Sequence, residues 1–146
     1  MITIIPATKD HIEQVAPLFD RYRIFYGQDS NLSAATRFLE QRMSRNESVI
    51  FLALDEQEAV GFTQLYTTFS SVSMERVFIL NDLFVLNSHR KKGIGEALLN
   101  RAKTHCKERG YKGLALETAT NNPAQQLYER LGWKKDAHCF HYFWTA

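Results

Sequence analysis

The sequence is poor in the residues that build disulfide frameworks and metal centres. Only two cysteines, Cys106 and Cys139, occur among its 146 residues, and they stand far apart in no Cys-x-x-Cys or Cys/His cluster. A disulfide scaffold and a structural zinc site are therefore excluded, and a reduced, cytoplasmic environment is expected. The histidines fall at no metal-ligand spacing, so we expect no metal; they are His11, His89, His105, His138 and His141.

Long apolar runs and a dominant sign of charge are missing as well. No stretch approaches the roughly 18 apolar residues that span a bilayer, and the N-terminus lacks the pattern of a signal peptide, so neither a membrane segment nor secretion is expected. Lys and Arg number 18 against 16 Asp and Glu, which leaves a net charge of +2 and little attraction for nucleic acid. What remains is a soluble globular chain, and 45% hydrophobic residues suffice for one domain over residues 1–146.

Hydrophobic periodicity in the first half predicts a strand, two helices and then an antiparallel sheet. The helices show apolar residues at helical spacing, and the strands show β-branched and aromatic runs bounded by polar turns. Between the two helices, the aromatic stretch 22–27 fits either a pocket wall or ordinary core packing. We expect strands near 2–5, 49–54, 60–66 and 77–86, and helices near 12–22 and 33–46.

The second half changes to alternating helices and strands. One helix is expected over 93–109 and another over 123–131, each followed directly by glycine. Strands are expected at 114–116 and twice within the tail from 133 to 144. The sequence therefore predicts an α/β fold with a mixed sheet of about six to seven strands, antiparallel in its first half, and about four helices.

The turn after the apolar run 77–86 carries the clearest chemical signal. It joins a buried strand to an amphipathic helix through a basic segment with glycine at 90–93. Free backbone N–H groups and the positive end of the helix dipole bind anions at helix starts, and glycine lets a phosphate approach closely. The turn is not a Rossmann fingerprint, because Leu98 stands at the third glycine position, and no P-loop string occurs in the chain.

Two motifs in this order resemble the GCN5-related N-acetyltransferase (GNAT) family. Arg-x-x-Gly-x-Gly at 90–95 is similar to the family's coenzyme A pyrophosphate loop. Asn-x-x-Ala-x-x-Leu-Tyr at 121–128, followed by Gly-Trp at 132–133, is similar to its second signature. The resemblance covers nearly the whole chain and implies a sheet that splays between two central parallel strands. Segments 70–73 and 80–85 look most like the polyamine and histone acetyltransferase branches.

The resemblance implies acetyl-coenzyme A as the acyl donor and suggests which residues hold it. Backbone groups of the strand would contact the pantetheine arm and the acetyl carbonyl, the basic turn would bind the pyrophosphate, and Asn121 would hydrogen-bond the pantetheine or the incoming amine. The Tyr128 hydroxyl would lie near the sulfur as general acid, although simple core packing stays open for it. The expected cofactor-binding residues are Leu83, Phe84, Val85, Arg90, Lys91, Lys92, Gly93, Ile94, Gly95, Glu96, Asn121, Ala124, Leu127 and Tyr128.

Two polar residues interrupt the apolar strand where a general base is needed. Asn81 stands where the resemblance to the polyamine branch implies a glutamate, so the identity of the base is open. Asp82 is expected either to bind or deprotonate the amine, or to anchor a bulge or a basic neighbour. Glu117 on the next strand is another candidate base, with a surface salt bridge as its alternative. The expected catalytic residues are Tyr128, Asp82 and Asn81.

These features together favour an acyltransferase that moves an acetyl group to a small primary amine, such as a polyamine or an amino acid, by direct attack in a ternary complex. Cys139 fits strand packing better than the role of a covalent nucleophile. Two other functions stay open: acetylation of a protein lysine or N-terminus, and a non-catalytic acyl-coenzyme A sensor. The aromatic residues of the tail also suggest a homodimer, through exposed apolar surface or strand pairing.

Overall fold

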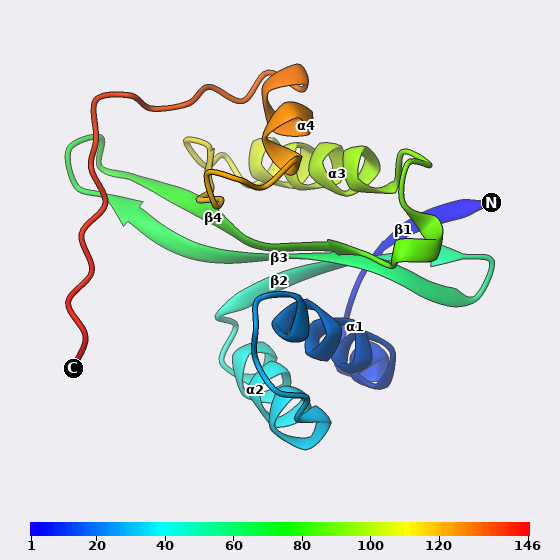
Figure 1. The fold of residues 1–146 in the computed structure, drawn as a ribbon. Helices are drawn as coiled ribbons and strands as arrows, with labels where there is room; N and C mark the ends of the chain where they lie inside the picture. Colours follow the sequence, from blue (N-terminus) through cyan, green and yellow to red (C-terminus); the bar gives the residue numbers. More distant parts are fainter.

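A five-stranded sheet runs through the protein and carries helices on both faces (Figure 1). The computed structural model describes residues Met1 to Ala146. The strands follow the order β1-β2-β3-β4-β5, in which the first four pair antiparallel and β4 and β5 pair parallel. They are β1 (Ile2–Pro6), β2 (Ser48–Asp55), β3 (Glu58–Ser70), β4 (Glu75–Val85) and β5 (Leu114–Ala115).

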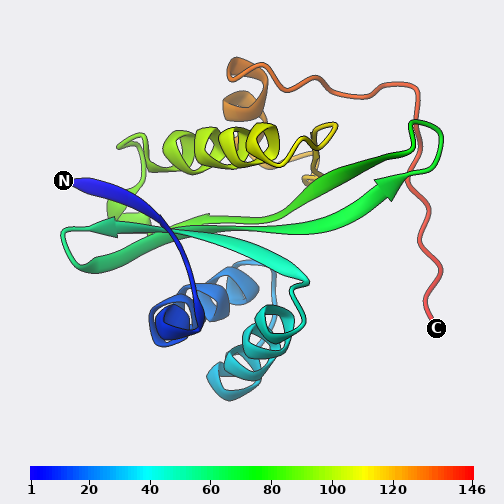
Figure 2. The same cartoon turned by 180° about the vertical axis from the view of Figure 1, so that it is seen from behind.

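The four expected helices form two layers, one on each face of the sheet. One face carries α1 (Ile12–Phe25) and α2 (Leu32–Ser44), and the other carries α3 (Ile94–Glu108) and α4 (Ala124–Arg130), as both views show (Figure 2). Short 3₁₀ turns precede α1 at Lys9–His11 and follow β4 at Asn87–His89. None of the helices combines the length and the apolar character that crossing a membrane requires.

Each helical layer buries its own apolar cluster against the sheet. On one side Val15 and Phe19 of α1 and Leu39 of α2 pack on β2 and β3. On the other side the apolar stripe of α3 packs on the opposite face, and the four residues expected on that stripe are all buried: Ile94, Leu98, Ala102 and Cys106. Residues at these spacings lie on one side of a helix, which is why the sequence predicted this face correctly.

A β-bulge interrupts β4 next to the place where β4 and β5 part. Gln64 of β3 lies opposite Asp82 while the next residue of β3 lies opposite Leu80, so Asn81 is an extra, unpaired residue. On its other side β4 pairs with β5 at only two positions, Phe78 and Ile79. The remaining end of β4, from Leu80 to Val85, therefore has no strand partner along that edge.

The expected strand number was too high, because the two strands predicted between 133 and 144 do not form. Residues 134–146 contain no helix or strand, and every one of them is exposed. A strand needs a neighbouring edge that satisfies its backbone N–H and C=O groups, and these residues form no backbone–backbone hydrogen bond with the rest of the chain. The sheet consequently has five strands rather than six or seven, and its last member, β5, is a short edge.

Candidate active site

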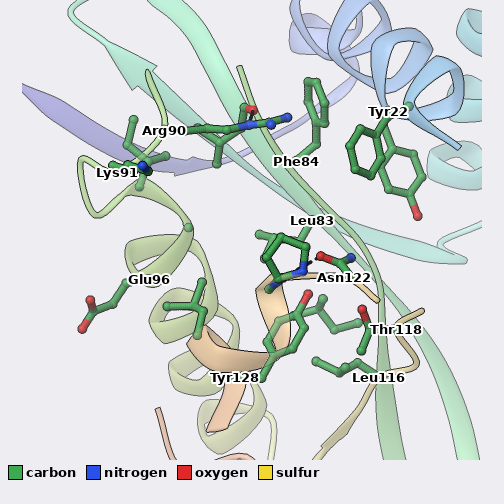
Figure 3. A pocket seen from close by; sticks show the side chains of 18 of the residues that line it. Tyr22, Leu83, Phe84, Arg90, Lys91, Glu96, Leu116, Thr118, Asn122 and Tyr128 are labelled. Atoms are coloured by element: carbon green, nitrogen blue, oxygen red, sulfur yellow. Dashed lines mark hydrogen bonds between the residues drawn. The ribbon is translucent and has the colours of Figure 1, made fainter. Parts of the chain in front are cut away.

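A cavity of about 350 Å³ lies where β4 and β5 separate. Its walls come from the end of β4, the segment 116–118 after β5, the start of α3, the α4 helix and the end of α1 (Figure 3). The bulge in β4 and the early end of the β4–β5 pairing produce this opening, because two strands that stay paired leave no room between them. The segments that form it are far apart in the sequence, and most of the expected site residues lie in its wall.

The start of α3 presents a row of free backbone donors to this cavity. The amide N–H groups of the six consecutive residues from Lys91 to Glu96 donate to no acceptor within the protein, and Gly93 caps the helix without a side-chain hydrogen bond. Lys91 and Gly93 adopt left-handed backbone angles, with φ of 63° and 80°, which turn the chain sharply into the helix. Such a row of donors at the positive end of a 15-residue helix suits an anion.

Arg90 lines the cavity, and its charged group is held by contacts with β4 and α1. Its Nε donates a 3.0 Å hydrogen bond to the carbonyl oxygen of Val85, and its guanidinium lies 5.9 Å from the ring centre of Phe25 and 5.8 Å from that of Phe84. Lys91 also lines the cavity, whereas Lys92 does not. The positive charge is therefore positioned by the end of β4 and by α1, close to the free donors of α3.

The free edge of β4 directs selected backbone groups toward the cavity. The N–H of Leu86 bonds the carbonyl of Val60 in β3, at 2.8 Å. Backbone groups of alternate residues point to the same neighbour in an antiparallel pair, so those of Phe84 also face β3. The groups of Leu83 and Val85 then face the opposite edge, where no strand follows. The N–H groups of these two residues are available to a ligand.

Tyr128 projects its hydroxyl into the cavity from α4, toward Leu83 and Asn122 (Figure 3). The hydroxyl makes no hydrogen bond within the protein. Burial, with a smaller contribution from Tyr26, raises the pKa of Tyr128 to about 12. Tyr128 therefore stays protonated at any ordinary pH and remains a free donor in the site.

The asparagine that lines the cavity is Asn122, not its neighbour Asn121. The side-chain oxygen of Asn122 accepts a 2.9 Å hydrogen bond from the N–H of Ala124, the first residue of α4, in the pattern of an Asx turn. Asn-Pro before a helix is a turn signal in the sequence that points to Asn122 rather than Asn121. Thr118, also in the wall, has a buried hydroxyl oxygen without any hydrogen-bond partner in the protein.

Asp82 lies behind the cavity wall rather than in it. Its side chain is 1% exposed, and its two oxygens accept hydrogen bonds from Gln64 Nε2 at 2.6 Å and Asn81 Nδ2 at 2.8 Å. Burial raises the pKa of its carboxyl group, although these hydrogen bonds oppose the shift. Asn81 lines the cavity on the bulge, where its carbonyl accepts a 3.0 Å hydrogen bond from the Tyr22 hydroxyl. Asp82 thus bonds to residues on both strands at the bulge, and its part in the reaction stays a prediction.

Two glutamates line the cavity and differ in their surroundings. Glu96 points away from Tyr128 and approaches Arg130 at 3.4 Å, which links α3 to α4 (Figure 3). Glu117 is mostly exposed and lies 3.1 Å from the Nδ1 atom of His141. Glu117 therefore forms the surface pair considered for it and still belongs to the cavity wall.

The aromatic stretch at the end of α1 forms part of the wall. Tyr22, Phe25 and Tyr26 all line the cavity, and the Tyr22 and Tyr26 ring centres lie 5.0 Å apart in an edge-to-face arrangement. The sequence left a pocket wall and core packing open for this stretch, and the structure shows the pocket wall. Helical spacing alone could not decide, because the answer depends on how α1 crosses the end of β4.

No metal site and no reactive cysteine accompany the cavity. No group of three or more His, Cys, Asp or Glu side chains is placed to hold a metal ion. Cys106 is buried in α3, and Cys139 is exposed in the tail, so the strand packing expected for Cys139 does not occur. Hydrogen bonding to Asp136 raises the pKa of the Cys139 thiol, which lowers its thiolate fraction.

Known proteins resemble this chain over most of its length. Residues 12–133 match the model of the acetyltransferase (GNAT) family. The uncharacterized N-acetyltransferase YhfO of Bacillus subtilis is 50% identical over 129 residues, which are 88% of this chain and 87% of YhfO. A probable acetyltransferase of Haemophilus influenzae is 35% identical over 139 residues, 86% of this chain and 95% of that protein.

More distant and structural relatives agree with this picture. A D-amino-acid N-acetyltransferase of Saccharomyces cerevisiae is 32% identical over 88 residues, 58% of this chain and 55% of that protein. A crystal structure of a probable acetyltransferase superposes with a TM-score of 0.92 at 39% identity and covers 99% of this chain and 97% of the other. The cavity with its free helix start and the match to the family model lead to one conclusion: the chain belongs to the GNAT family of acetyltransferases.

Proposed function

We propose that this acetyltransferase transfers the acetyl group of acetyl-coenzyme A directly to the primary amine of a small molecule, within a ternary complex. As a member of the GNAT family it uses acetyl-coenzyme A as the donor. One observation carries the rest of the proposal: the free donors of α3, the free edge of β4 and the Tyr128 hydroxyl all meet in one cavity. The whole chain, residues 1–146, acts as one N-acetyltransferase domain in this proposal.

The residues present fit the parts of the donor. The six free N–H groups from Lys91 to Glu96, with Arg90 beside them, suit a diphosphate. The edge groups of Leu83 and Val85 suit the amide-containing arm and the thioester carbonyl, and Ala124 and Leu127 offer an apolar surface beside them. The contributions of Lys92 and Asn121, which do not line the cavity, stay predictions from the sequence.

Two groups act on the charges that develop during transfer. The Val85 N–H is the donor for the oxyanion that forms when the amine attacks the thioester carbonyl, an effect often worth about 3 kcal/mol. Tyr128 donates its proton toward the departing sulfur. With a pKa of about 12 it is a weaker acid than a typical thiol by roughly 3 to 4 units, so a hydrogen bond to the sulfur precedes complete proton transfer.

The general base that deprotonates the acceptor's ammonium group is a residue other than Asp82. Asp82 is enclosed by Gln64 and Asn81, and an amide such as that of Asn81 does not accept a proton from an ammonium group near neutral pH. Glu117 is the carboxylate in the wall that remains open to solvent and to an incoming amine. We propose that the ammonium substrate loses its proton to Glu117, directly or through water.

A small acceptor is favoured by the shape of the cavity and by one relative. The acceptor end is walled by Tyr22, Tyr26 and Asn81, which suits a small polar molecule with an apolar part. The yeast relative is a D-amino-acid N-acetyltransferase, whose acceptors are small amines. The likeness of segments 70–73 and 80–85 to polyamine and histone branches stays a prediction, as do the homodimer, the cytoplasmic setting and the lack of nucleic-acid, membrane and metal partners.

Calorimetry with acetyl-coenzyme A, followed by thiol release on a panel of amines and peptides, tests the proposal. We expect binding of the donor and turnover with a small amine. Turnover only with peptides would favour a protein acceptor, and binding without any turnover would favour a sensor. Arg90→Ala should weaken donor binding, whereas Lys107→Ala, which removes the same charge at the far end of α3, should not. Equal affinities of the two variants for acetyl-coenzyme A would show that this loop does not bind the pyrophosphate.

A further inference from the structure

One buried hydroxyl group in the cavity wall has no hydrogen-bond partner in the protein. Buried polar atoms without a partner are rare in folded proteins. Six side chains of this protein contain one: Ser48, Gln64, Arg101, His105, Thr118 and Trp133. Among these six, Thr118 is the residue that lines the cavity between β4 and β5. A buried hydroxyl left unpaired destabilises a protein, so an unpaired one that faces a binding cavity indicates a partner atom on the ligand.

The segment after β5 directs the Thr118 side chain toward the layer of α3 and α4. Leu114, Leu116 and Thr118 are partly buried, whereas Ala115 and Glu117 between them are exposed. The two leucines pack against the apolar cluster around α3. Successive side chains of an extended segment alternate between its two sides, so Thr118 lies on the same side as these leucines. This is also the side from which α4 approaches the cavity.

Thr118 and Tyr128 bring two free hydroxyl groups to one end of the cavity. Both residues line it, and both hydroxyls point into the part of the cavity where Asn122 lies (Figure 3). Like the Tyr128 hydroxyl, the Thr118 hydroxyl is not engaged by any acceptor in the protein. Each can therefore donate its O–H to the same region of a bound substrate.

The reaction needs a second donor at the sulfur, because Tyr128 alone is a weak acid there. With a pKa raised by burial to about 12, Tyr128 leaves most of the negative charge on the sulfur when the carbon–sulfur bond breaks. Hydrogen bonds to a charged atom are stronger than those between neutral groups, and they are stronger still in a cavity that excludes water. A second O–H group at this place stabilises the charge that the tyrosine does not remove.

We propose that Thr118 is a catalytic residue, whose hydroxyl hydrogen-bonds the sulfur of acetyl-coenzyme A beside Tyr128 as that sulfur leaves. This inference rests on the proposed transfer reaction. The amine nitrogen forms a bond to the thioester carbon, the carbon–sulfur bond breaks, and its electron pair goes to the sulfur. The amine loses its proton to the base, and Tyr128 supplies the proton that the sulfur finally takes. Thr118 keeps its own proton and shares it only in the hydrogen bond.

Thr118→Val tests the proposal, because valine has the shape of threonine without its hydroxyl. The hydroxyl has no partner in the protein, so removing it should raise the midpoint of urea unfolding measured without substrate. During transfer the same change removes a hydrogen bond to a charged atom, so kcat should fall about 10-fold or more. The calorimetric affinity for acetyl-coenzyme A should change little, because the bond strengthens only as charge develops. Thr118→Ser, which retains the hydroxyl, should restore most of kcat.

Ser48→Ala is the matched control. Ser48 also has a buried hydroxyl without a partner, but it lies at the start of β2 and does not line the cavity, so this variant should keep the wild-type kcat. An unchanged kcat in Thr118→Val would overturn the inference, and so would a lower kcat that accompanies a loss of stability. Weaker donor binding with unchanged kcat would place the hydroxyl on another part of the donor and would also overturn it. Absence of wild-type turnover with any amine would instead contradict the proposed function.

The thiol of bound coenzyme A provides a second measurement that needs no acceptor. Hydrogen-bond donors at the sulfur favour the thiolate form, which is followed by its ultraviolet absorbance as the difference between the complex and the protein alone. Thr118→Val should raise the pH at which the bound thiol ionises by about one unit, which corresponds to the tenfold effect expected on kcat. Ser48→Ala should leave this pH unchanged. The same ionisation pH in wild type and Thr118→Val would show that the hydroxyl does not contact the sulfur.

Discussion

Gly61 of β3 lies opposite Val85 of β4 beside the candidate site, and replacing it with alanine tests the packing that positions the site. Gly61 pairs with Val85, and the neighbouring Val60 accepts the N–H of Leu86 at 2.8 Å. A Cβ atom at Gly61 would lie 2.9 Å from the carbonyl oxygen of Phe84 and 3.3 Å from Val85 Cγ2. The first of these is a backbone atom, so the contact cannot be relieved by rotating a side chain.

The size of the effect follows from this geometry. Inserting a methyl group into a packed interior destabilises the folded state by about 1 to 3 kcal/mol. Replacing glycine also lowers the conformational entropy of the unfolded chain, which stabilises the protein by about 0.4 to 1 kcal/mol. We therefore expect Gly61→Ala to lower the free energy of unfolding by about 0 to 2.6 kcal/mol, and by about 1 to 3 kcal/mol relative to a glycine-to-alanine change that makes no clash. The strain falls on Phe84 and Val85, so kcat/KM should also drop about tenfold or more, since small displacements of reacting groups are costly.

Gly113→Ala is the matched control for this prediction. A Cβ atom at Gly113 meets nothing within 4 Å, and its φ lies outside the range that only glycine tolerates easily. This variant lowers the conformational entropy of the unfolded chain by the same amount but introduces no clash in the folded state. Urea unfolding of the two variants, with thiol-release assays beside it, isolates the contact at Phe84. If their free energies of unfolding agree within about 0.5 kcal/mol, β3 and β4 are not packed tightly enough at Gly61 for the added methyl group to clash.

Two further predictions concern side chains of the site. Tyr128→Phe should lower kcat about 100-fold or more while calorimetric affinity for acetyl-coenzyme A changes little, and an unchanged kcat would remove Tyr128 from the acid role. Since burial raises its pKa to about 12, turnover of the wild type should show no loss from Tyr128 ionisation below about pH 10. Burial also raises the pKa of Asp82, so the folded state holds that proton more tightly than the unfolded state, and the resulting stability falls as pH rises above about 4. The difference in free energy of unfolding between wild type and Asp82→Asn should therefore move in favour of the variant from pH 4 to pH 8; a constant difference in urea titrations would contradict the raised pKa.

Local chemistry explains what could be predicted from the sequence. The turn before α3 needs only its own residues, because Gly93 and the free N–H groups that follow are properties of a helix start. The buried stripe of α3 likewise follows from spacing alone. These elements were predicted with their correct roles in the fold.

Long-range register explains most of what could not be predicted. Whether Asp82 faces the cavity depends on where β3 places its bulge, since one extra residue at Asn81 changes which neighbours face which side. The place of Asn122 rather than Asn121 in the cavity wall has a similar cause, because the path of the loop into α4 decides which side chain faces the cavity. A sequence pattern records the residue types at such places but not the partner strand that orients them.

The C-terminal tail, residues 134–146, shows that a preference for strand structure alone does not produce a strand. Its aromatic residues have a high preference for strands, which is why strands were expected between 133 and 144, yet in the single chain they pair with nothing. A β-strand forms only when its backbone pairs with a neighbouring strand. The preference of a segment therefore predicts a strand only where a free sheet edge is available to it. In this fold the free edge of β5 exists, and the chain leads its own tail past it.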